Sequence, residues 1–76
     1  MEKEELAKIL RERYEKAKRT EAAMAIHLFG IEYADEIRKG NYPVTELVEL
    51  AGIGKGYAAE VSKGIKLASH VRIKEG

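Results

Sequence analysis

Apolar residues recur at spacings of three and four through residues 2–18, with charged side chains between them. The apolar positions are Leu6, Ile9, Leu10, Tyr14 and Ala17. This spacing predicts an amphipathic helix, because residues three and four apart share one face of an α-helix. Acid-first pairs at i and i+4, such as Glu4 with Lys8, stabilise the same helix.

A second helix is predicted from about Thr20 to about Lys39, with apolar residues on more than one face. These residues are Met24, Ile26, Leu28, Phe29, Ile31, Tyr33, Ala34 and Ile37. Such breadth indicates a central and largely buried helix. Gly40 and Asn41 supply the left-handed conformation that commonly ends helices, and Pro43 stands where a new helix can start.

Residues 44–68 predict two shorter helices joined by a glycine turn. The apolar face of the third helix consists of Val44, Leu47, Val48 and Ala51, and Gly52 ends it. The fourth helix starts at about Lys55, and its apolar face consists of Ala58, Val61, Ile65 and Ala68. Gly64 lies inside this helix, where glycine costs about 1 kcal/mol relative to alanine. Close approach of another helix is therefore expected at Gly64.

The tail, residues 69–74, alternates polar and apolar side chains, which is typical of a short strand. A lone strand is unstable in water, so the tail is either a flexible end or pairs with a second copy of the chain. The expected fold is mainly α. It is a compact four-helix domain of residues 1–76, with a helix-turn-helix-like unit at about 44–68 and a short strand-like tail.

Composition narrows the class of protein. A chain of 76 residues buries about 60% of the surface that its unfolded form exposes, so association of protomers would add stability. The chain has no cysteine, which excludes disulfides and cysteine-ligated zinc. Its first residues lack a basic segment followed by an apolar run, and no apolar stretch approaches 18 residues. A cytoplasmic protein without membrane insertion is expected.

The net charge of +1 conceals an asymmetry along the chain. Residues 1–50 hold nine Lys and Arg against eleven Asp and Glu, whereas residues 51–76 hold five against two. The basic residues of the second part are Lys55, Lys63, Lys66, Arg72 and Lys74. An anionic partner would meet a locally positive surface beside the glycine turn. A solvated lysine-rich helix face without a partner is the other interpretation.

The glycine turn and its flanking helices carry two resemblances. Leu47, Ala51, Ile53, Ala58 and Val61 fill the apolar places, and Gly52 the turn, of a segment that resembles the helix-turn-helix of bacterial repressors. This resemblance implies that the helix starting near Lys55 enters the major groove. Its exposed positions would be Lys55, Gly56, Ala59, Glu60 and Lys63. Base reading commonly uses Arg, Asn, Gln or Lys with bidentate geometry, whereas this face offers Gly56, Ala59 and the acid Glu60. It therefore favours contacts to phosphate over contacts to base edges.

The run Ala51-Gly52-Ile53-Gly54, with Ala58 and Val61 after it, also resembles the helix-hairpin-helix of DNA repair and replication proteins. Glycines there let the backbone approach a phosphate, and the amides that open the following helix point at the anion. The resemblance implies binding that is indifferent to sequence. This chain has Ala51 and Lys55 where that family often has proline. A turn required only for helix packing is the third interpretation.

The sequence does not support a metal site or a catalytic site. His27 and His70 are the only histidines and lie far apart, without the i, i+4 pairing of helical zinc sites. Carboxylates are dispersed among lysines and arginines at helical spacing. No catalytic residue, metal or cofactor is expected, and the chain is not predicted to be an enzyme.

The sequence thus predicts a small DNA-binding protein, with transcriptional regulation as one role, that contacts the DNA backbone through the glycine turn and the basic helix after it. The predicted DNA-binding residues are Gly52, Gly54, Lys55, Gly56, Tyr57, Lys63, Lys66 and Arg72. A homodimer formed through the tail or the first helix is a further expectation. The alternative is a protein-interaction or dimerisation module that binds no nucleic acid.

Overall fold

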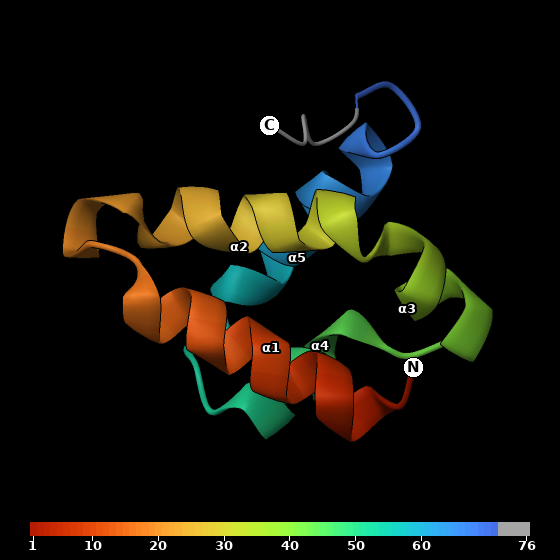
Figure 1. Cartoon of the computed structure of the whole chain (residues 1–76), viewed down its shortest axis with the longest axis horizontal. Coiled ribbons are helices and arrows are strands. Elements are labelled where there is room, and N and C mark those ends of the chain that lie inside the picture. Colours follow the sequence, from red (N-terminus) through yellow and green to blue (C-terminus); the bar gives the residue numbers. More distant parts are fainter. Residues whose placement is uncertain (72–76) are drawn as a thin grey trace.

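A computed structural model of the protein describes residues 1–71, which form helices and turns (Figure 1). In chain order the elements are α1 (Lys3–Lys16), the 3-10 helix η1 (Arg19–Glu21), α2 (Ala22–Glu32), α3 (Ala34–Gly40), α4 (Val44–Ala51) and α5 (Tyr57–Leu67). The mainly α class is confirmed. No helix among the described residues is long and apolar enough to cross a membrane.

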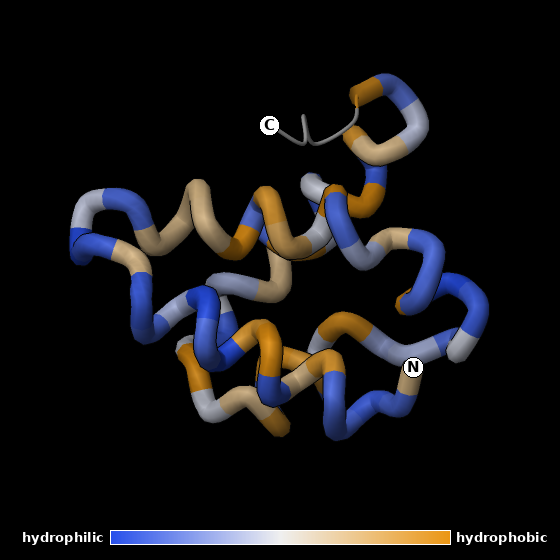
Figure 2. Tube along the Cα trace, viewed as in Figure 1, coloured by the Kyte–Doolittle hydropathy of each residue, from blue (hydrophilic) through white to orange (hydrophobic). Residues whose placement is uncertain are grey.

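The hydrophobic core lies where α1, α2, α4 and α5 meet, with α1 packed on α2 and α4, and α2 packed on α5. Its largest fully buried side chains are Phe29, Leu6, Leu10, Ile26, Leu47, Val48 and Val61. In Figure 2, hydrophilic and hydrophobic residues alternate turn by turn along α1. The apolar faces predicted for the first, third and fourth helices therefore supply much of the core. Each such side chain contributes about 1.5–3 kcal/mol through its removal from water.

The predicted second helix is broken at Tyr33, so the described chain has five α-helices and the expected four-helix count is wrong. Tyr33 leaves helical geometry, with φ −106° and ψ 16°. Its ring packs on Phe29 at a centroid separation of 5.1 Å, and the Arg13 guanidinium lies 5.7 Å from the ring centroid. The bend returns Ile37 to the core, where it is buried. Two short helices thus bury apolar residues that one straight helix would spread around several faces.

Two predicted helix ends are confirmed by left-handed backbone. Asn41 ends α3 with φ 55°, and Gly52 ends α4 with φ 73°. The last carbonyl of α4, that of Ala51, accepts a hydrogen bond of 2.9 Å from Nη1 of Arg11 on α1. A Cβ at Gly52 would lie 2.7 Å from the same nitrogen. Glycine is therefore favoured at this position by its backbone conformation, whereas the end of the Arg11 side chain could move aside for a methyl group.

The strand predicted for the tail is wrong for its described part, residues 69–71. The backbone amides of His70 and Val71 both donate to the carbonyl of Leu67, at 2.8 and 2.9 Å. These bonds continue the last turn of α5 and leave no extended segment at 69–71. The rest of the predicted strand lies outside the described residues.

Helices α2 and α5 touch through their backbones at two buried glycines, Gly30 and Gly64. A Cβ at Gly64 would lie 2.9 Å from Cα of Gly30 and would also meet the carbonyl oxygen of His27. A Cβ at Gly30 would lie 2.5 Å from the carbonyl oxygen of Val61. The close approach expected at Gly64 is confirmed.

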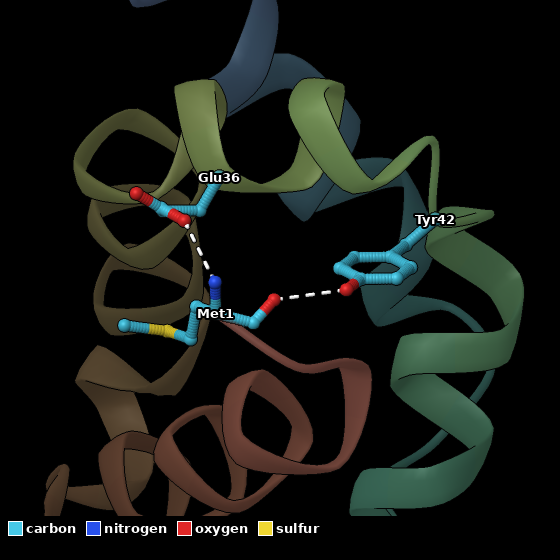
Figure 3. A network of polar contacts seen from close by, with 3 residues as sticks. All are labelled: Met1, Glu36 and Tyr42. Carbon is cyan, nitrogen blue, oxygen red and sulfur yellow. Dashed lines mark hydrogen bonds and ion pairs between the residues drawn. The ribbon is translucent and has the colours of Figure 1, made fainter.

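The first residue is held against α3 and the loop that follows it (Figure 3). The amino nitrogen of Met1 lies 3.2 Å from Oε2 of Glu36, and the Tyr42 hydroxyl donates a 2.8 Å hydrogen bond to the Met1 carbonyl. These contacts position the start of α1 beside α3. The loop between α3 and α4 lies at the opposite side of the view from the turn between α4 and α5 (Figure 1).

Candidate nucleic-acid interface

Helices α4 and α5 and the turn of residues 52–56, here called the glycine turn, form a helix-turn-helix unit inside the predicted range 44–68. Ile53 is buried and anchors the turn to the core. The amide of Tyr57 donates to the carbonyl of Gly54 at 3.0 Å, which begins the winding of α5. Four of the predicted DNA-binding residues, Gly52, Gly54, Lys55 and Gly56, are exposed on the outer side of the turn.

Three successive backbone amides, those of Gly54, Lys55 and Gly56, precede the first residue of α5. Within residues 1–71, no carbonyl or side chain accepts a hydrogen bond from them. The opening amides of a helix have no intrahelical partner and carry the positive end of the helix dipole. An anion can therefore bind at this exposed start of α5.

The fold itself does not require glycine at positions 54 and 56. Among the described glycines only Gly52 has a positive φ. A Cβ at Gly56 would meet nothing within 4 Å, and one at Gly54 would make ordinary contact with the Tyr57 ring at 3.8 Å. Side chains are thus sterically allowed at both positions. Their absence leaves the backbone of the turn open to a close-approaching group.

Lys55, Lys63 and Lys66, here called the lysine stripe, are exposed at the start and along one face of α5. Lys63 and Lys66 lie three residues apart and share one face of α5, and Lys55 lies in the turn two residues before the helix. The stripe therefore extends the positive region from the glycine turn along the helix. The Lys63 side chain is 63% exposed, whereas the side chain of its ion-pair partner Glu60 is 25% exposed.

Glu60 is the one acid on α5 between the lysines, and it pairs with Lys63 and lies beside His27. Its Oε2 lies 3.4 Å from Nδ1 of His27 on α2, and its Oε1 lies 3.5 Å from Nζ of Lys63. The carboxylate is drawn toward α2, with only a quarter of the side chain exposed. An exposed ion pair such as that with Lys63 contributes little and is readily given up to a phosphate.

One predicted site residue, Tyr57, is less exposed than the other described ones. Tyr57 is half-buried and packs edge-on against Tyr14 of α1, with ring centroids 5.3 Å apart and an interplanar angle of 68°. Arg72 lies outside the described residues. The structure thus gathers Gly52, Gly54, Lys55 and Gly56 in the turn, with Lys63 and Lys66 along α5.

The charge on α4 limits the direction from which an anion can approach. Glu46 and Glu49 are exposed on this helix. Glu49 also lines a hollow of about 210 Å³ between α4 and α5, together with Lys55, Val48 and Ala58. A phosphate approaching over α4 would meet carboxylates, whereas one approaching the start of α5 would meet amides and lysines.

The family of the chain agrees with this geometry. Residues 2–74, which include all the described helices, match the family described as an HTH-like domain. Comparison with curated proteins and with solved structures finds no match. The family match covers nearly the whole chain, far more than the segment 47–61 whose residues carried the resemblance. The chain belongs to the family of HTH-like domains.

Proposed function

We propose that this protein binds DNA, with phosphate groups seated on the glycine turn and along the lysine stripe. The observation that carries the proposal is the set of three unpartnered amides at residues 54–56, within the described chain, beside Lys55 and in line with Lys63 and Lys66. Backbone amides at a helix start and lysine side chains are the groups that proteins commonly use for phosphate. Membership of the HTH-like family supports the same function.

Phosphate contacts account for this surface better than base reading does. The exposed positions at the start of α5 include Gly56 and Ala59, which offer no side-chain donor or acceptor to a base edge. We therefore assign most of the affinity to the sequence-independent electrostatic interaction. The same proposal includes a cytoplasmic role in transcription. It also includes pairing of two copies on one duplex, which would double the number of phosphate contacts.

A salt titration tests the proposal directly. If Lys55, Lys63 and Lys66 each neutralise one phosphate, the logarithm of the association constant should fall with the logarithm of salt concentration with a slope of about −2.7. Affinity for a short mixed-sequence duplex should then drop about 40-fold between 50 and 200 mM salt. Fluorescence anisotropy of a labelled duplex measures both values. No binding at the lower salt to any duplex would leave the interaction-module alternative.

Replacing Gly56 by alanine should separate the stability of the turn from its binding. Gly56 has φ −58° and ψ −23°, a conformation that alanine adopts freely, and open space for the methyl group. The variant should gain about 0.4–1 kcal/mol in free energy of unfolding. Affinity for duplex should fall, because the methyl group occupies the place of an approaching phosphate.

Thermal melting and the anisotropy titration measure these two effects on the same sample. A raised melting temperature with weakened binding supports backbone contact at the turn. A raised melting temperature with unchanged affinity would show that the phosphate does not approach Gly56.

A further inference from the structure

A second basic segment lies at the same end of the molecule as the glycine turn. Lys16, Lys18 and Arg19 are exposed in the connection between α1 and α2. Figure 1 shows this connection and the turn between α4 and α5 on the same side of the molecule, and Figure 2 shows the connection to be largely hydrophilic. Positive charge near the turn therefore comes from two parts of the chain that are distant in sequence.

A hollow of about 450 Å³ lies between the end of α1, the connection to α2 and the first residue of α5. It is lined by Tyr14, Glu15, Ala17, Arg19, Ala22 and Tyr57. Its volume falls within the range of about 300–1,000 Å³ typical of small-molecule sites. The side chains of the lining thus include two aromatic rings, one guanidinium and one carboxylate.

The hollow is connected to the glycine turn through Tyr57, which lines it. Tyr57 directly follows Gly56, and its ring carbons lie 3.8 Å from the place that a Cβ of Gly54 would occupy. The ring of Tyr57 also contacts Tyr14, which lines the same hollow. Tyr57 therefore links the hollow to the turn whose amides would hold the phosphate of a bound nucleotide.

The lining favours a base over a phosphate as the occupant. Aromatic side chains offer a π-face to any nucleobase, whereas they add nothing to the binding of an anion. The carboxylate of Glu15 would repel a phosphate but can accept a hydrogen bond from the exocyclic amine of cytosine or adenine. The exposed guanidinium of Arg19 stands at the rim, where it can meet the neighbouring phosphate.

We propose that this hollow takes one unpaired nucleobase, while the phosphate of the same nucleotide sits on the amides of residues 54–56. The inference rests on the phosphate contacts proposed above and names their preferred substrate. Bases of an intact duplex are stacked and cannot enter the hollow without being unstacked. The protein should therefore prefer nucleic acid that already presents a free base, such as a duplex with a single-nucleotide bulge.

The test compares one duplex with the same duplex carrying a one-nucleotide bulge. The native chain should bind the bulged form roughly tenfold more tightly, the effect of stacking one base. Binding of the bulged form should also quench tyrosine fluorescence. Tyr42→Phe is the matched control, because Tyr42 is engaged with Met1 and should not contribute to the quenching.

Two variants locate the base in the hollow. Tyr14→Leu keeps an apolar side chain at the edge of the core but removes the ring, and Arg19→Gln changes only an exposed side chain. Both should lose most of the preference for the bulge. Tyr14→Leu should keep the affinity for intact duplex, whereas Arg19→Gln removes a positive charge near the turn and should lower that affinity by no more than the loss of one phosphate contact. Arg19→Gln keeps the test valid if Tyr14→Leu does not fold.

The outcomes separate this inference from the proposed function. Equal affinity for bulged and intact duplex overturns the hollow as a base site and leaves duplex binding in place. A preference that persists in both variants also overturns it, since the free base would then bind elsewhere or merely make the duplex more flexible. Absence of binding to either form rejects the proposed function as well.

Discussion

Replacing Gly64 by alanine is expected to lower the free energy of unfolding by about 3 kcal/mol, at the upper end for overpacked interiors. The added methyl group would lie 2.9 Å from Cα of Gly30 and would meet the carbonyl oxygen of His27. Both are backbone atoms of α2, so no side-chain rotation can relieve the contact. The two helices would have to move apart, and the α2–α5 interface is the most extensive in the fold.

The sign of the effect is diagnostic, because helix propensity alone predicts the opposite. In an exposed helix, glycine to alanine stabilises by about 1 kcal/mol. Thermal unfolding followed by circular dichroism should show a melting temperature lowered by roughly 12–24 °C for a domain of this size. Gly56→Ala is the matched control, since it adds the same methyl group in open space. If Gly64→Ala is as stable as the native protein, the backbones of α2 and α5 do not approach as described.

Local patterns were sufficient to predict the helical faces and their ends. The period of three and four predicted α1, α4 and α5. Helix ends were expected at the pair Gly40-Asn41 and at Gly52, and the structure shows Asn41 and Gly52 in the left-handed conformation. The break at Tyr33 was not predictable in the same way. No proline or glycine marks it, and it depends on packing of Tyr33 with Phe29 and Arg13. A single-sequence pattern carries no signal for such tertiary contacts.

The candidate site likewise contains features that the sequence predicted and features that it did not. Exposure of Lys63 and Lys66 on one face of α5 follows from helical spacing, and the sequence predicted them together with Lys55 of the turn. Tyr57 was predicted on the DNA surface, but its ring is half-buried against Tyr14. The position of α1 and of its connection to α2 beside the helix-turn-helix unit was not predicted. It arises only when the fold brings together segments that are distant in sequence, as with Arg11 and the end of α4.

Replacing both Lys55 and Lys63 by glutamate is expected to lower affinity for duplex DNA by roughly 100-fold or more at 50 mM salt. Each lysine that neutralises a phosphate releases a counterion, and each glutamate adds repulsion in its place. The fold should be retained, because both side chains are exposed and the ion pair of Lys63 with Glu60 is a surface pair. Anisotropy titrations measure the affinity, and circular dichroism checks the helicity.

A variant that combines Lys55→Gln with Lys63→Gln shows how many phosphate contacts are lost. Its salt slope should fall from about −2.7 to about −0.9, because each lost phosphate contact reduces the slope by about one. Lys8→Gln with Lys39→Gln is the matched control, since these lysines are exposed on α1 and α3, outside the helix-turn-helix unit. A slope unchanged by the first pair would mean that DNA meets another face. Because the slope counts contacts rather than stability, it distinguishes lost phosphate binding from a weakened fold.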